Sequence, residues 1–546
     1  MIRGILVVSL LASPLAAHAA AARTAERPKA QRATQAELNA LFAYIKDGWT
    51  TLTRTPKALA QAAADEKMAA GARALVYVPA DASVETISAE LKESLSAEER
   101  ARIELRSLPK DGRIPEKPGL LYLPQPYVVP GGRFNEMYGW DSYFILVGLL
   151  RDGRTALAKG MTDNYIYEME QYGKVHNDNR TYYLTRSQPP FLTEMVLGVY
   201  GKTGDKVWLR AAVPALESYY KYWSTGDHRS GETGLSRYFD EGEGPAPEVV
   251  SAERDEKGRT HYDRVKDFLK SNPIPGYDLA RQYDAGKDEL TPFFYKNDRS
   301  MRESGFDPSD RFGPFNSEVV DISPVCLNSL LYRFESDLGE IHGILGDGEG
   351  AVEWKRRAAA RKTALNALMW DEKDGLYYDY DQVAKTRRRY AFVTTFYPLW
   401  AGIADAEQAA RVRANLLKFE RAGGLLTSTR VTGKQWDAPF GWAPMQLLAV
   451  EGLRRYGFSV EADRVSINFL SMILKDFLEH HAVFEKYDVV RRRSNVAKGL
   501  RFGYTSNEIG FGWTNAAFVE LYSQLGKDRR AAVLNLDGLP VPQASR

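Results

Sequence analysis

Residues 130–143 bring many reactive and ligand-binding side chains into one short segment, Pro-Gly-Gly-Arg-Phe-Asn-Glu-Met-Tyr-Gly-Trp-Asp-Ser-Tyr. The guanidinium of Arg133 and the carboxylate of Asp141 are groups that hydrogen-bond vicinal hydroxyls, and the indole of Trp140 can stack on the apolar face of a sugar ring. Two adjacent glycines at the start of the segment let the backbone approach a ligand closely. Because folding does not require all of these residue types together, the segment is a candidate binding loop.

Two other segments place a carboxyl group beside aromatic rings. Residues 302–307 read Arg-Glu-Ser-Gly-Phe-Asp, and residues 484–488 read Phe-Glu-Lys-Tyr-Asp. A carboxyl group that apolar rings desolvate favours its protonated form, and the hydrolysis of a glycosidic bond needs one such acid and a second carboxyl group across the bond. Structural ion pairs also collect such neighbours, so spacing alone does not select a catalytic pair.

The segment at 130–143 and a second one at 435–444, Gln-Trp-Asp-Ala-Pro-Phe-Gly-Trp-Ala-Pro, resemble the two signature patterns of the trehalases. These glycoside hydrolases split α,α-trehalose into two glucose molecules. The resemblance extends over roughly residues 35–525 and implies an all-α fold, an (α/α)6 barrel with long loops over its active-site end. It also implies an inverting mechanism in which Asp307 is the general acid and Glu485 is the general base.

The same resemblance implies a set of substrate-binding residues. One group comes from residues 177–190, which are similar to the family's Arg-Ser-Gln-Pro-Pro segment. The two prolines of that segment can start a helix, so the polar residues before them are expected in a loop that can face a ligand, although they could also serve only to begin the helix. The implied substrate-binding residues are Arg133, Trp140, Asp141, Asn177, Arg186, Ser187, Gln188, Glu248, Arg302, Gly305, Trp436 and Asp437.

The chain departs from the family pattern in two places. Many bacterial members have an Arg-Pro-Glu segment with a substrate-binding arginine, whereas this chain has Ala246 before its proline and glutamate. Arg302 or Arg254 could compensate for the missing arginine. The glycine-rich run with a glutamate that often precedes the family's Gly-Phe-Gly-Trp-Thr-Asn segment is replaced here by residues 498–504, so a lid of altered contacts is expected.

Helical periodicity must provide the scaffold for these segments. Apolar residues recur at every third or fourth position from Leu327 to Leu338, which predicts a helix capped by Ser323 and ended by Gly339. Another helix is predicted to start at Thr514. Many such helices, joined by glycine-rich and aromatic loops that carry the chemical motifs, favour helices paired around one centre.

The organisation along the chain predicts one large catalytic domain over residues 35–526. Strand-like runs are scarce, with residues 74–78 as one short candidate. Residues 227–300 are rich in Pro, Gly and charged residues and predict a long loop excursion over one end of the barrel. Residues 527–546 form a peripheral C-terminal tail in this interpretation.

Composition excludes several classes of function. The formal net charge is only +2, which argues against a nucleic-acid partner. The one cysteine, Cys326, excludes an internal disulfide and is expected as a buried core residue. The seven histidines show no metal-binding spacing, and no dinucleotide or phosphate loop is present, so neither a metal nor another cofactor is expected.

The first residues resemble a targeting segment. Arg3 precedes an apolar run that is too short to span a bilayer, and Ala17 and Ala19 stand where a signal peptidase cleaves. This pattern predicts a signal peptide over residues 1–19, a loose leader over 20–34, and a periplasmic or secreted protein without a membrane contact after cleavage. A monomer acting on a small molecule, trehalose, is expected. Two rival hypotheses are a related α-glucosidase acting on another sugar and a non-catalytic sugar-binding protein.

Overall fold

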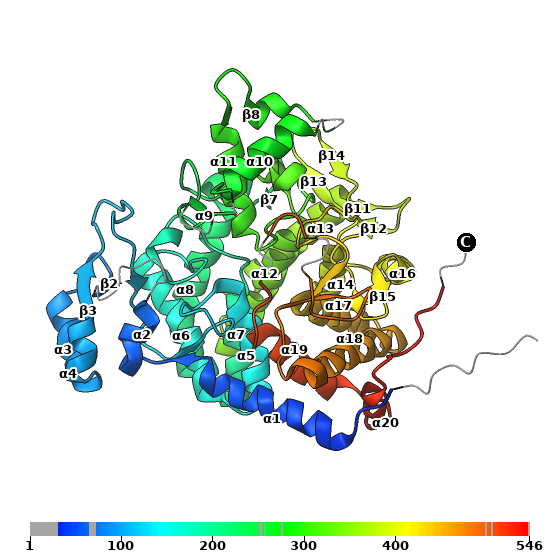
Figure 1. The fold of residues 1–546 in the computed structure, drawn as a ribbon, viewed down its shortest axis with the longest axis horizontal. Coiled ribbons are helices and arrows are strands. Elements are labelled where there is room, and N and C mark those ends of the chain that lie inside the picture. The colour runs from blue at the N-terminus through cyan, green and yellow to red at the C-terminus, as the bar shows by residue number, and fades with distance from the viewer. Residues whose placement is uncertain are drawn as a thin grey trace, which may run out of the picture.

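Two concentric sets of helices form the body of the protein. The computed structural model describes residues 31–64, 73–250, 254–255, 257–272, 274, 277–496, 500–503 and 506–543. Within them, each helix of the inner set contacts the next, and the last contacts the first, so that the ring is closed (Figure 1). The inner helices are α5 (Gly139–Arg151), α7 (Leu192–Thr203), α12 (Val325–Leu345), α14 (Tyr397–Ala401), α17 (Ala443–Arg455) and α19 (Gly512–Gln524).

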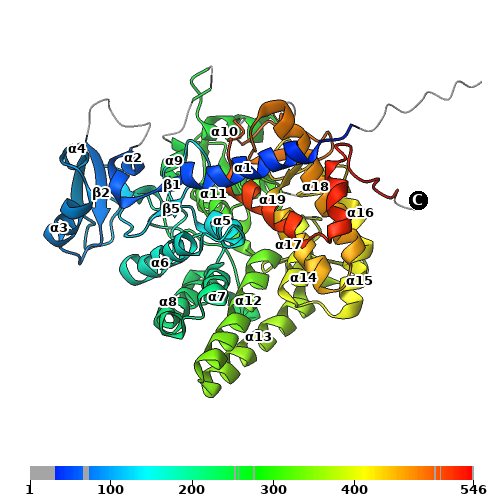
Figure 2. The same ribbon diagram turned by 90° about the horizontal axis from the view of Figure 1, so that it is seen from below.

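The outer helices complete the predicted (α/α)6 barrel. Most of them follow their inner partner directly in the chain, and the N-terminal helix α1 packs against α18 and α19 from outside (Figure 2). This alternation of inner and outer helices confirms the fold class that the resemblance implied. The outer helices are α1 (Gln35–Thr51), α6 (Thr155–Tyr172), α8 (Lys206–Ser224), α13 (Gly348–Met369), α15 (Ala406–Ala414) and α18 (Ser459–His480).

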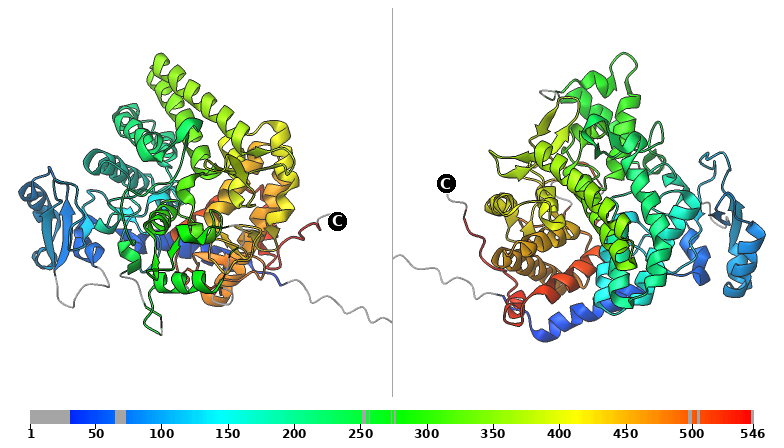
Figure 3. Two further views of the ribbon diagram at one scale, coloured as in Figure 1. Left: turned by 90° about the horizontal axis from the view of Figure 1, so that it is seen from above. Right: turned by 180° about the vertical axis from the view of Figure 1, so that it is seen from behind.

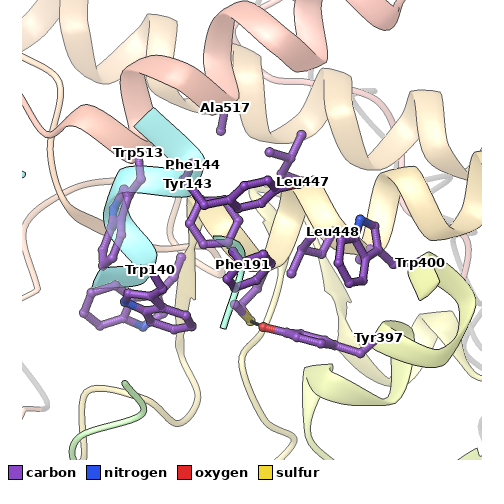
Figure 4. Packing of buried hydrophobic residues seen from close by; sticks show 14 of the residues in the cluster. Trp140, Tyr143, Phe144, Phe191, Tyr397, Trp400, Leu447, Leu448, Trp513 and Ala517 are labelled. Atoms are coloured by element: carbon purple, nitrogen blue, oxygen red, sulfur yellow. Dashed lines mark hydrogen bonds between the residues drawn. The ribbon is translucent and has the colours of Figure 1, made fainter. Parts of the chain in front are cut away.

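The main core lies between the inner helices, where their apolar side chains converge (Figure 4). Tyr143 of α5 stacks on Phe191, which immediately precedes α7, with ring centroids 4.3 Å apart and planes inclined by 10°. Burying an aromatic side chain of this size contributes roughly 1.5–3 kcal/mol. Such ring contacts between neighbouring helices fix the ends from which the site segments emerge.

Two predicted helix boundaries are wrong for reasons that the structure makes clear. Helix α12 does not end at Gly339 but continues to Leu345. The glycine instead allows α13 to pack closely, since a Cβ there would lie 3.2 Å from Cγ of Lys355. The Ser323 hydroxyl does not cap the helix but donates a hydrogen bond to the Ser230 hydroxyl. Helix α19 starts two residues before Thr514, whose hydroxyl donates to the backbone carbonyl of Phe484 at 2.8 Å.

A small α/β unit is attached to one side of the barrel. Strand β2 (Ala74–Val78) was predicted, and it lies between β3 (Ile103–Ser107) and β4 (Leu120–Leu121) in a parallel three-stranded sheet. Helices α2 (Leu59–Ala63) and α3 (Val84–Ser94) pack with it around a separate apolar cluster, and α4 (Ala97–Arg102) contacts α2 and β3. The unit is visible at the left of Figure 1. The sequence analysis did not predict it.

The excursion at 227–300 is more ordered than a loop. It contains the short helix α9 (Pro247–Val250) and the longer helices α10 (His261–Ser271) and α11 (Pro292–Glu303), and it rises from one end of the barrel (Figure 3). Its apolar side chains form a small core that also includes Phe315 and Phe502. The excursion therefore packs against residues that precede α12 and α19.

The terminal segments pack against each other. The backbone N–H of Ala33 donates to the carbonyl of Leu534 at 2.8 Å, and that of Leu536 donates to Gln31 at 2.9 Å. Val533 is fully buried. The tail is thus peripheral but attached over the described residues up to 543. No helix in the described part of the chain has the length and apolar character needed to cross a membrane.

Candidate active site

The predicted site residues come from segments that precede the inner helices or form their first turns. Trp140 and Asp141 begin α5, the residues at 186–188 lead into α7, Asp307 precedes α12, and Glu485 precedes α19. Because the N-termini of consecutive inner helices lie at the same end of the barrel, this topology gathers segments that are far apart in the sequence. The site is built where those segments meet.

Asp307 is held by a segment that packs closely on α5. Gly305 has a φ of +76°, and a Cβ there would lie 2.8 Å from the indole of Trp140, so only glycine fits without strain. The nearest cation is Arg302, whose Nη1 lies 3.7 Å from Oδ2 of Asp307. Burial raises the pKa of Asp307 to about 6, although Arg302 and Arg186 oppose the shift. This carboxyl group is suited to donate a proton near neutral pH.

Glu485 is buried and its backbone is fixed from two sides. Its N–H donates to the carbonyl of Glu508 at 3.0 Å, and its own carbonyl accepts from the indole N–H of Trp513 at 3.0 Å. Its carboxylate Oε2 lies 3.5 Å from Nζ of Lys486. A cation therefore lies next to the carboxylate that the resemblance implies as general base.

Asp141 connects the two predicted catalytic carboxyl groups electrostatically. Burial raises its pKa well above the usual range, and the charges of Glu485 and Asp307 raise it further. Asp141 therefore lies within reach of the charges of both groups. The structure thus places Asp141 near both of the carboxyl groups that the resemblance implies as acid and base.

A charged network continues from Asp307 toward α7. The guanidinium of the buried Arg186 donates to Oδ1 of Asn177 at 2.9 Å and also contacts Glu248 and Asp240. Burial alone would lower the pKa of Arg186, but the two carboxylates raise it above its usual value. Arg302 extends this network, because its Nε lies 4.0 Å from Glu248.

The structure distinguishes the two arginines that could replace the family's missing one. Ala246 is buried in the small core of the excursion. Arg254 donates to the nearby carbonyl of Gly258 at 3.0 Å on the exposed surface. Arg302 lies among Asp298, Glu248 and Asp307, so its guanidinium is the one placed at the site.

A cluster of aromatic rings lies next to the segments that carry these charged groups. Trp436 stacks on Trp442 at 3.9 Å with nearly parallel planes, and Trp140 contacts Trp436 at 5.7 Å and Phe306 at 5.4 Å. Trp442 is fully buried, in agreement with a core role, and Trp140 and Trp436 are almost as buried. The ring cluster therefore packs against the segments that carry Asp141 and Asp307 and helps to fix their positions.

Three of the predicted contact residues are engaged with the protein itself. Both carboxylate oxygens of Asp437 accept hydrogen bonds, from Tyr390, Ser428 and Thr432 hydroxyls at 2.7 Å and from a backbone N–H. The fully buried hydroxyl of Ser187 lies 2.9 Å from that of Tyr219, and the side-chain amide oxygen of Gln188 accepts from the backbone N–H of Trp140 at 3.0 Å. These contacts fix the site segments relative to one another.

Two carboxylates at the site were missed in the sequence. Glu303 accepts from the backbone N–H groups of Ser187 and Phe239, so it joins the segments before α7 and α12. Glu508 forms an ion pair with Arg133, with Nε and Oε1 2.8 Å apart. Glu303 lies inside the segment already singled out, and Glu508 lies just before the Gly-Phe-Gly-Trp run, so proximity to those motifs was the available signal.

The described residues contain no group of three or more His, Cys, Asp or Glu side chains that could hold a metal ion. Cys326 is buried as expected, and its Sγ lies 3.4 Å from a guanidinium nitrogen of Arg311.

The chain is similar to a known protein family and to several curated proteins. The family model described as Trehalase matches residues 12–526. The cytosolic neutral trehalase of Beauveria bassiana is 38% identical over 439 residues, covering 72% of this chain and 58% of that protein. The cytosolic neutral trehalase of Saccharomyces cerevisiae is 38% identical over 431 residues, covering 72% and 56%. The chain thus spans less than two thirds of the length of these curated relatives.

Solved structures of known proteins are also similar to this chain. The neutral trehalase of Saccharomyces cerevisiae superposes with a TM-score of 0.76 and 32% identity, covering 92% of this chain and 96% of that one. A mannosylglycerate hydrolase from Thermus thermophilus gives a TM-score of 0.50 at 19% identity, with 73% and 96% coverage, which is a likeness of fold alone.

The predicted periplasmic or secreted location is wrong. The relatives at 38% identity are named cytosolic neutral trehalases, which contradicts an exported protein. The signal peptide predicted at residues 1–19 lies outside the described residues, as does most of the predicted leader. The short apolar run and small residues that suggested export are a pattern of composition and carry little specificity.

Proposed function

The chain belongs to the trehalase family, and on that premise we propose that it hydrolyses α,α-trehalose to two glucose molecules with inversion at the attacked carbon. In this mechanism Asp307 protonates the glycosidic oxygen as the bond to the leaving glucose breaks. Glu485 takes a proton from a water molecule that attacks the same anomeric carbon from the opposite face. Each carboxyl group changes its protonation state once, and proton exchange with solvent restores both.

The environments of the two carboxyl groups support this division of roles. Burial raises the pKa of Asp307 to about 6, so roughly half of this group keeps its proton at pH 6 and roughly a tenth at pH 7, more than for an ordinary aspartate. The carboxylate of Glu485 lies 3.5 Å from the ammonium group of Lys486. One carboxyl group that stays protonated and one that stays ionised are what an inverting glycosidase requires.

The remaining polar residues are proposed to orient the sugar. Side chains that line the site and carry donors or acceptors for hydroxyl groups are Arg133, Asp141, Asn177, Arg186, Gln188, Glu248 and Arg302. Trp140 and Gly305 shape the surface beside Asp307, whereas Ser187, Trp436 and Asp437 hold the supporting segments. We propose one catalytic domain over residues 35–526 that includes the small α/β unit, acting as a monomer in the cytoplasm.

The single observation that carries this proposal is the convergence of the segments of Asp307, Asp141 and Glu485. The ring of Trp140, next to Asp141, lies against Gly305 and 6.2 Å from the ring of Trp513, whose indole N–H donates to the carbonyl of Glu485. A binding protein has no need for an acid and a base at one place, which argues against a non-catalytic role. The test is glucose release by the purified protein from trehalose, maltose, sucrose and trehalose 6-phosphate. Release from trehalose alone is expected. Faster release from maltose would favour an α-glucosidase of different specificity, and no release from any sugar would refute hydrolysis.

A further inference from the structure

Lys486 is a fully buried lysine that directly follows the proposed base. Its Nζ lies 3.5 Å from Oε2 of Glu485, 3.2 Å from Oε1 of Gln435 and 3.4 Å from the carbonyl of Ser506. Lysine is almost never fully buried unless it is paired, and here burial lowers its pKa while Glu485 opposes that shift. We therefore expect the positive charge of Lys486 to have a function at this buried position.

The other charged groups around Glu485 are mostly negative. Asp141 on α5 and Glu508 before α19 both interact with its charge, and burial raises the pKa of each of them. Asp307 interacts with Asp141 and with Lys486. Arg133 supplies a positive charge, but its side chain is 45% exposed and is paired with Glu508 at 2.8 Å. The buried positive charge beside Glu485 is therefore that of Lys486.

The same ammonium group reaches toward the segment of the proposed acid. Gln435 accepts a hydrogen bond from Lys486 and donates another through Nε2 to the backbone carbonyl of Asp307. Gln435 is itself fixed, since its carbonyl accepts from the indole N–H of Trp442 at 3.0 Å. Trp442 in β17 (Phe440–Trp442) stands opposite Lys486 in β18 (Lys486–Asp488). Two side chains thus span the distance between the base and the acid segment.

We propose that Lys486 is a positioning residue that holds Glu485 in its ionised form and, through Gln435, links it to the segment that carries Asp307. This role rests on the proposed function of Glu485 as general base. Without the lysine, Asp141, Asp307 and Glu508 would favour a protonated Glu485, which cannot accept a proton from water. The hydrogen bond to Gln435, which connects the segment of the base to that of the acid, would also be lost.

The pH profile of kcat/KM separates this role from a purely structural one, because its acidic limb reports the pKa of the base in the free enzyme. In Lys486→Met the acidic limb should move to higher pH by ~1–3 units, the usual effect of one adjacent cation on a carboxyl group. Lys486→Arg keeps the charge and should keep the limb nearer its original position. An acidic limb unchanged in folded Lys486→Met would overturn the proposal.

Lys434 offers a matched control. It is also buried, but its Nζ pairs with Asp310 at 2.9 Å and lies over the ring of Phe315 at 4.3 Å. Lys434→Met should lower thermal stability yet leave the acidic limb in place. A limb that moves equally in both variants would show a general effect of losing a buried cation and would also overturn the proposal.

Thermal stability gives a readout that needs no substrate. In Lys486→Met, a raised folded-state pKa of Glu485 makes stability fall as pH rises from about 4 toward 7, because the buried carboxylate must then ionise without its partner. The added variant Lys486→Met/Glu485→Gln should lose this pH dependence, and it should fold even where Lys486→Met does not. A double variant no more stable at pH 7 than Lys486→Met refutes the pairing. Absence of trehalose hydrolysis by the unaltered protein refutes only the proposed function.

Discussion

Gly305 and Trp140 are in such close contact that the backbone of one lies against the indole of the other. A Cβ on Gly305 would come within 2.8 Å of the ring, and the φ of +76° disfavours any residue with a side chain. Because Asp307 follows two residues later, this contact sets the position of the proposed acid relative to α5. The geometry of the site therefore depends on the absence of a side chain at residue 305.

Gly305→Ala should therefore reduce both stability and activity. The left-handed backbone alone costs about 1–2 kcal/mol for a residue with a Cβ, and the clash adds a displacement of Asp307. Gly153→Ala is the matched control, since its φ is +74° and no atom lies within 4 Å of the added Cβ. Chemical denaturation and glucose release are measured for both. Equal rate losses in the two variants would show that the contact with Trp140 has no part in catalysis.

Asp307→Asn and Glu485→Gln should each leave a folded protein with a rate reduced by roughly 10²–10⁴-fold, the range that positioned acid–base groups supply. Both replacements keep the shape of the side chain and remove its ability to exchange a proton. Initial rates of glucose release, with thermal unfolding to verify folding, are the measurement. Near-normal turnover by either variant would remove that residue from its role.

The basic limb of the pH profile should fall near pH 6. Asp307 must carry a proton to act as acid, and burial raises its pKa to about 6, so kcat/KM declines as the pH rises through that value. Arg302 opposes this shift, so Arg302→Met should move the basic limb to higher pH even as the overall rate drops. A basic limb that moves to lower pH in this variant would contradict the assignment of the acid.

Asp437→Asn should act through stability. Its carboxylate accepts three hydroxyl donors and one backbone donor, and the amide leaves at least one buried donor unsatisfied, at a cost of about 1–3 kcal/mol. Asp111→Asn, which removes only a surface ion pair with Arg113, should change stability little. Urea denaturation measures both. Unchanged stability of Asp437→Asn with a higher KM would instead support direct contact with the sugar.

The anomeric configuration of the products tests the mechanism. If Glu485 activates water, the attacked ring appears as β-glucose and the leaving glucose keeps its α configuration, and the two carboxyl groups must leave ~6.5–9.5 Å for the water between them. Proton NMR of the anomeric signals, recorded before mutarotation, should show equal α and β intensities. Only α-glucose at early times would mean a retaining enzyme with Glu485 as nucleophile.

Local patterns predicted the parts of this protein that depend on neighbours in the sequence. Apolar spacing predicted the buried face of α12, whereas Asp307, Glu485 and Asp141 were implied as site residues by the resemblance to the family's motifs. The α/β unit escaped prediction because β3, with the sequence Ile-Glu-Leu-Arg-Ser, forms one edge of a small sheet and keeps its polar residues partly exposed. Such a strand carries little of the apolar signal by which buried strands are recognised.

The roles of individual polar residues could not be predicted because their partners are distant in the chain. Asp437 reads as a sugar ligand in its motif, but Tyr390 and Asp310 supply donors from 47 and 127 positions away. Gly339 reads as a helix stop, yet it serves close packing of α13. Motifs establish which residues gather at a site, whereas tertiary contacts decide which of them face a ligand.

The closed ring of inner helices has a consequence for how the chain is made. Arg151 of α5 and Glu520 of α19 form two hydrogen bonds of 2.7 Å across 369 positions of sequence. During synthesis, α5 leaves the ribosome long before α19 exists, so the part of its surface that packs on α19 has no partner in the meantime. The ring therefore closes only after Glu485 has been translated, and we expect this long-range closure to be a slow step during which apolar surface of the inner helices is exposed.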